Sequence, residues 1–63
     1  MAEDFKSYVE GTMNTLQQCV KDGMIESDPA YVRTVTENLL EHEQFLSENQ
    51  KTYVNNINSQ VQN

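Results

Sequence analysis

The one histidine of this 63-residue sequence, His42, is the side chain best suited to acid–base or metal chemistry. On a helix, a metal site or a catalytic pair needs a partner three or four residues away, as in the Glu-x-x-His spacing of di-metal bundles. The residues at those distances are Asn38, Leu39, Phe45 and Leu46, none of which is a carboxylate. We therefore expect an interface histidine that forms a hydrogen bond across helices, with a pH-sensing role as the less favoured alternative.

The sequence also holds one cysteine, Cys19, near the end of a predicted helix. The negative end of the helix dipole disfavours a thiolate there, so a small buried side chain is favoured over a redox switch. A single cysteine cannot form an internal disulfide, and no Cys/His grouping has the spacing of zinc ligands. An unpaired thiol is typical of a protein in the reducing cytoplasm.

Acidic side chains dominate the charge of the chain, with ten Asp and Glu against four Lys and Arg and a net charge of −6. This balance opposes direct binding to nucleic acid or to an anionic membrane. Glu37, Glu41 and Glu48 make up the acidic face that a partner would meet, and Glu10 adds to the charge of the first helix. We favour an ordinary solvated face. The alternative is nucleic-acid mimicry, in which an acidic helical protein blocks a basic partner.

The motifs of catalysis and cofactor binding are missing from the sequence. It has no glycine-rich phosphate loop, no Ser/His/Asp set and no pair of carboxylates placed for a cleft. It also lacks a secretory signal and an apolar run long enough to span a membrane. We therefore predict no enzyme activity, no cofactor, no metal and no membrane association. A chain of this length that begins at Met1 fits a cytoplasmic bacterial or phage accessory protein.

The first predicted element is an amphipathic helix over about residues 3–22. Tyr8 and Met13 flank its apolar face, which carries residues at helical spacing: Phe5, Val9, Thr12, Leu16, Cys19 and Val20. Gly23 predicts the end of this helix, because glycine readily takes the left-handed conformation of a helix C-terminus. After a turn over residues 23–28, Asp28 and Pro29 are typical of an N-cap and a first helical residue.

The second predicted helix is long, covering about residues 29–61. Steps of three and four residues define one stripe along it: Val32, Val35, Leu39, His42, Leu46, Asn49, Tyr53, Ile57 and Val61. Such a helix would be ~50 Å long, about twice the length of the first. The first helix therefore covers only its beginning, and the end of the stripe is left without a partner in its own chain.

These patterns predict an all-α fold in a single domain, residues 1–63. The expected architecture is a two-helix antiparallel hairpin with a long second helix, which dimerises into a coiled-coil-like or four-helix arrangement. The predicted self-association or partner interface comprises Leu39, His42, Phe45, Leu46, Asn49, Tyr53, Val54, Ile57 and Val61. Asn49 has two interpretations: a buried asparagine that fixes the register of the seam, or a hydrated one beyond the end of the hairpin.

The functional prediction is a small, acidic, non-catalytic protein–protein interaction module, such as an inhibitor, an adaptor or an assembly factor. Its partner would be a second copy, another protein, or both. One alternative is a structural component of a larger assembly such as a phage particle. The other is the acidic nucleic-acid mimic described above.

Overall fold

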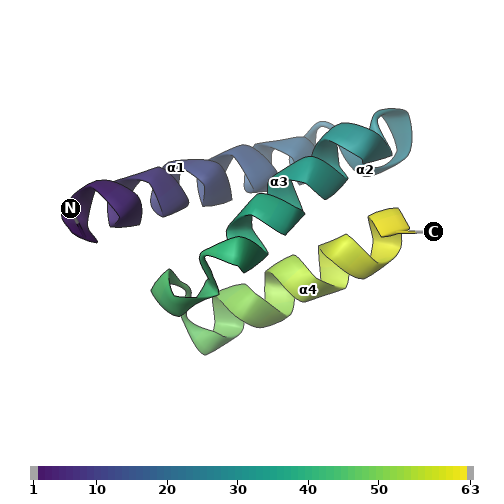
Figure 1. Cartoon of the computed structure of the whole chain (residues 1–63). Helices are drawn as coiled ribbons and strands as arrows, with labels where there is room; N and C mark the ends of the chain where they lie inside the picture. Colours follow the sequence, from purple (N-terminus) through teal and green to yellow (C-terminus); the bar gives the residue numbers. More distant parts are fainter. Residues whose placement is uncertain (1, 63) are drawn as a thin grey trace.

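The structure is a computed structural model that describes residues 2–62, with side chains described from Asp4 onward. Over residues 2–62 all regular structure is helical and no strand occurs, which confirms the all-α prediction (Figure 1). The elements are α1 (Ala2–Lys21), α2 (Met24–Ser27), α3 (Pro29–Glu41), the 3₁₀-helix η1 (Glu43–Phe45) and α4 (Glu48–Gln62).

The end of α1 is set by Gly23, which adopts the predicted left-handed conformation with φ 73° and ψ 22°. Its N–H donates to the carbonyl oxygen of Val20 at 3.2 Å, so one of the last carbonyls of α1 is satisfied. The predicted turn over residues 23–28 contains the single helical turn α2. Met24 and Ile25 of this turn are partly buried and pack against the core.

The beginning of α3 also follows the sequence signal. The Asp28 side chain accepts a hydrogen bond from the backbone N–H of Tyr31 at 3.3 Å, and Pro29 occupies the first turn of the helix. Proline is harmless there, because the N–H that it lacks would have no partner within the helix.

The prediction of one continuous helix over residues 29–61 is wrong. α3 ends at Glu41, where His42 leaves the helical conformation with φ −117° and ψ 33° and donates its N–H to the Leu39 carbonyl oxygen at 3.0 Å. One 3₁₀ turn follows, and Leu46 is then extended, with φ −101° and ψ 143°. The chain therefore changes direction between His42 and Ser47.

A capping box starts the next helix. The Ser47 N–H donates to Gln50 Oε1 at 2.9 Å, and the Gln50 N–H donates to Ser47 Oγ at 3.2 Å. This reciprocal pair satisfies two backbone donors that a helix N-terminus otherwise leaves without partners. Glu48, in the first turn of α4, complements the positive end of the helix dipole.

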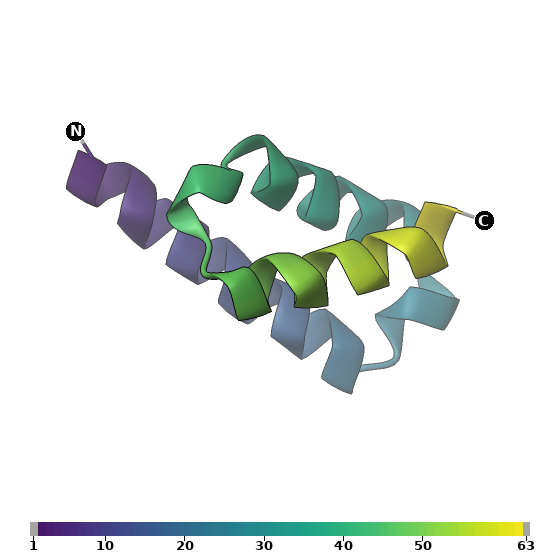
Figure 2. The same ribbon diagram turned by 90° about the horizontal axis from the view of Figure 1, so that it is seen from below.

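The break replaces the expected two-helix hairpin with an arrangement of α1, α3 and α4 around a shared core. Figure 2 shows α4 lying across the pair formed by α1 and α3, and the two ends of the chain lie at opposite ends of the molecule. The longest dimension is 35 Å, well short of the ~50 Å of an unbroken second helix.

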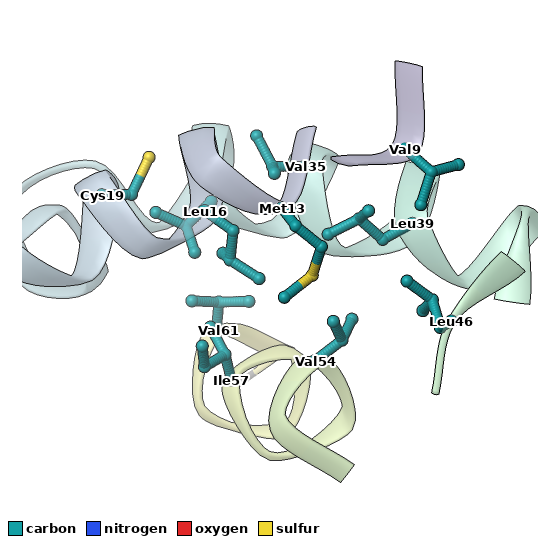
Figure 3. Packing of buried hydrophobic residues seen from close by; sticks show 11 residues of the cluster. Val9, Met13, Leu16, Cys19, Val35, Leu39, Leu46, Val54, Ile57 and Val61 are labelled. Atoms are coloured by element: carbon teal, nitrogen blue, oxygen red, sulfur yellow. The ribbon is translucent and has the colours of Figure 1, made fainter. Parts of the chain in front are cut away.

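The core draws apolar residues from all three long helices and from the segment before α4. Figure 3 shows Met13 and Leu16 of α1 directed toward the α4 side chains. Two expectations for α1 are corrected: Met13, expected on a flank, is buried, and Phe5, expected on the buried face, is half exposed. The buried cluster comprises Val9, Met13, Leu16, Cys19, Val32, Val35, Leu39, Leu46, Val54, Ile57 and Val61.

A polar contact also joins α3 to α4. The hydroxyl of Thr36 is fully buried, and its proton is shared between the Arg33 carbonyl oxygen and Asn58 Oδ1, each at 2.9 Å. No buried side-chain N or O atom among the described residues lacks a hydrogen-bond partner. Because an apolar contact alone tolerates sliding, this hydrogen bond helps to fix the register of the two helices.

Candidate functional site

Most of the predicted self-association or partner interface lies in the core of its own chain. Five of its members are buried, and Tyr53 is partly buried. Asn49 is exposed, which matches the hydrated alternative. The basis for an uncovered stripe was therefore wrong, because the chain reversal brings α4 back over α1 and α3. The buried members are Leu39, Leu46, Val54, Ile57 and Val61.

His42 and Phe45 are different, because they meet two aromatic residues of α1 at the surface. The ring centroids of Phe5 and His42 are 5.4 Å apart with an interplanar angle of 30°, and those of Phe5 and Phe45 are 6.1 Å apart at 6°. Tyr8 meets His42 edge-on, with centroids 5.9 Å apart at 73°. We call Phe5, Tyr8, His42 and Phe45 the aromatic patch.

Backbone geometry at the end of α3 positions His42 in this patch. The ring Nδ1 lies 3.0 Å from the Asn38 carbonyl oxygen, which can only accept, so Nδ1 carries the proton. The Asn38 side chain in turn donates from Nδ2 to the Tyr8 hydroxyl. Asn38 therefore holds two of the four rings, His42 through its backbone and Tyr8 through its amide.

The aromatic patch borders an open surface hollow of about 370 Å³, lined by Asp4, Phe5, Tyr8 and His42. Phe5 is 48% exposed and Tyr8 is 49% exposed, so two neighbouring aromatic side chains of α1 are about half open to solvent. Small-molecule sites normally bury most of their ligand. An open hollow is better suited to one side chain of a larger partner.

The predicted acidic face does not form one cluster. Glu37, Glu41 and Glu48 are all exposed, the first two on α3 and the third at the start of α4. Glu37 accepts from Arg33 Nε at 3.3 Å, and Glu48 lies 3.6 Å from Lys51 Nζ. These exposed pairs contribute little to stability, but they reduce the charge that two of the three acids present to a partner.

Cys19 is a core residue, with a side chain 3% exposed. Burial raises the pKa of its thiol, and the nearby Asp22 and Asp28 carboxylates raise the pKa further. The neutral thiol is therefore the stable form, as expected for a structural cysteine. Tyr31, 44% exposed, borders a second hollow of about 360 Å³ beside Cys19 and Asp22.

No group of three or more His, Cys, Asp or Glu side chains that could hold a metal ion occurs among the residues that the structure describes. Over the same part of the chain, no helix is long and apolar enough to cross a membrane. No protein-family model matches this chain, and comparisons with curated proteins and with solved structures found no match.

The sequence pattern does not identify Asp4, Phe5, Tyr8 or Asn38 as site residues. Phe5 and Tyr8 are spaced i, i+3, which places two aromatic rings on neighbouring positions of one helix face, and this was the available signal. Asn38 carried no such signal, because its role depends on the end of α3 lying beside α1. His42, expected to form a hydrogen bond across helices, bonds instead to a carbonyl of its own helix.

Proposed function

We propose that this chain is a small non-catalytic interaction module that binds a partner protein through the aromatic patch. The observation that carries the proposal is the pair of rings, Phe5 and Tyr8, that remain about half exposed beside His42 and Phe45. Aromatic side chains are enriched at protein interfaces and supply much of their binding energy.

The patch is also ordered before any partner arrives. Ring stacking and the Asn38 hydrogen bonds restrict the side chains, so binding costs less conformational entropy than it would for mobile rings. This pre-organisation supports a binding role over an accidental exposure of apolar surface. A cytoplasmic location is part of the proposal, because it suits the unpaired thiol of Cys19.

Homodimerisation stays a prediction, and its basis has changed. The stripe that motivated it is largely buried within one chain, so a second copy would have to use another surface, such as the aromatic patch. Two chains of net charge −6 repel each other at long range, whereas a basic protein is attracted. We therefore favour a different protein as the partner.

The test is site-specific photo-crosslinking in the native cell, with a photoreactive phenylalanine analogue at position 5 and, as the matched control, at position 31. Both positions hold exposed aromatic residues, but Tyr31 lies outside the aromatic patch. We expect a discrete crosslinked protein from position 5 that is lost when Tyr8→Ala is added. Equal yields from both positions would contradict the proposal.

A further inference from the structure

The hollow beside the aromatic patch combines two features that attract a positive charge. The first is the set of aromatic rings that line it. The rings of Phe5 and His42 are stacked at an interplanar angle of 30°, Tyr8 meets His42 at 73°, and all three residues line the hollow. The face of an aromatic ring carries negative potential, and a cation within about 6 Å of the ring centroid is attracted to it.

The second feature is Asp4, an acidic residue that lines the same hollow. The ion pairs of the described residues join Arg33 to Glu37 and Lys51 to Glu48, and neither includes Asp4. The side chain is exposed, so its charge is presented to solvent at the edge of the rings. A cation seated on the rings would thus also meet an opposite charge.

Arginine fits this combination better than other side chains do. Its guanidinium is flat, stacks on aromatic faces, and offers several N–H donors to a carboxylate in the same plane. The net charge of −6 favours approach of a basic segment over a neutral or acidic one. The hollow of about 370 Å³ is also large enough to admit one long side chain.

We infer that the hollow lined by Asp4, Phe5, Tyr8 and His42 takes an arginine side chain from a basic segment of the partner protein. This inference rests on the proposed function and names the chemistry of the partner. The ring faces hold the guanidinium, and the Asp4 carboxylate accepts its N–H donors.

The test is a titration of the full chain with two small probes, in which NMR records the resonances of the protein. The probes are N-acetyl-arginine amide and its neutral isostere, N-acetyl-citrulline amide. We expect the arginine probe to cause saturable chemical-shift changes at the ring resonances of Phe5, Tyr8 and His42. The citrulline probe should bind with a dissociation constant at least about threefold higher. Asp4→Asn should weaken arginine binding about two- to fivefold, whereas the matched Asp22→Asn, in the second hollow, should not.

Phe5→Leu keeps an apolar side chain at that position and removes the aromatic face, so it should abolish the response without unfolding the chain. Equal binding of the two probes would overturn the inference, because the contact would then be merely apolar. Ring shifts that depend on protein concentration and not on arginine would also overturn it, in favour of a second copy. Either result leaves the proposed function standing when the crosslink at position 5 is retained. Arginine binding without that crosslink would contradict the proposed function.

Discussion

The thiol of Cys19 belongs to the core, although its residue type invites a redox interpretation. Because burial and two nearby carboxylates raise its pKa, the thiolate that reacts with alkylating reagents is scarce. We expect alkylation by iodoacetamide at pH 8 to be at least about tenfold slower in the native protein than in urea. Mass spectrometry of timed samples measures both rates. Equal rates would show that the thiol is accessible and would reopen the redox interpretation.

The raised pKa of Cys19 also has a consequence for stability. The unfolded chain loses the thiol proton as the pH rises through the ordinary value of 9.0, while the native state retains it. This group therefore contributes stability that is fully present below that pH and is lost above it.

The two glycines of the sequence should respond in opposite ways to the same substitution. Neither has an atom within 4 Å of an added Cβ, so backbone conformation alone decides the result. Gly23→Ala places a side chain at φ 73° and should cost about 1–2 kcal/mol of unfolding free energy. Gly11→Ala, inside α1, should stabilise by about 0.5–1 kcal/mol. Thermal melts of the two variants, followed by circular dichroism, test this sign difference. A change of the same sign at both positions would contradict it.

At the scale of the elements, the break between α3 and α4 is the feature that decides the architecture. Its capping box makes a specific prediction: Ser47→Ala should cost about 0.5–2 kcal/mol of unfolding free energy. Gln50→Ala should cost less, and the double variant less than the sum, because each residue bonds to the backbone of the other. Urea denaturation of the three variants measures each loss of unfolding free energy. The coupling energy is the difference between the loss in the double variant and the sum of the two single losses. Strict additivity would mean that the two bonds act independently.

Much of the local structure could be predicted from the sequence, since its signals are local. Gly23 and the Asp28–Pro29 pair mark the two helix ends correctly. The break could not be recognised from periodicity, because Leu39, Leu46 and Tyr53 continue a seven-residue spacing across it. The Ser47-x-x-Gln50 pattern is the local sign of a new helix, because it is the spacing of a capping box.

The aromatic patch was only partly predictable for the same reason. The sequence pattern places His42 and Phe45 in the expected interface but Phe5 on the buried face of the first helix. Which α1 face is buried depends on where α4 packs, and that position follows from the break. Because the break between α3 and α4 was not expected, most of the predicted interface residues belong to the core and not to the aromatic patch.

At the scale of the whole molecule, helices of one chain supply and cover the buried core. Its accessible surface is 4284 Å², close to the roughly 4,200 Å² expected for a compact monomer of its mass. Its radius of gyration is 11.2 Å, against about 11 Å for a compact chain of this length. The chain thus exposes about as much surface as a compact monomer of its mass, and the aromatic patch is a local feature of this surface.

We expect α4 to be essential to the fold, because its apolar side chains complete the core. Val54, Ile57 and Val61 each contribute on the order of 1.5–3 kcal/mol by burial, and a domain of this size has a net stability of only roughly 3–9 kcal/mol. Deleting residues 53–63 should therefore abolish the cooperative thermal transition and leave residual helix that melts gradually.

Two point variants serve as matched controls. Ile57→Ala should lower the free energy of unfolding by about 2–5 kcal/mol, whereas Asn56→Ala, at the exposed neighbouring position, should change it by less than about 0.5 kcal/mol. Circular dichroism and calorimetry measure all three. A truncated chain that still melts cooperatively would show that α1 and α3 fold alone and that α4 is an accessory element.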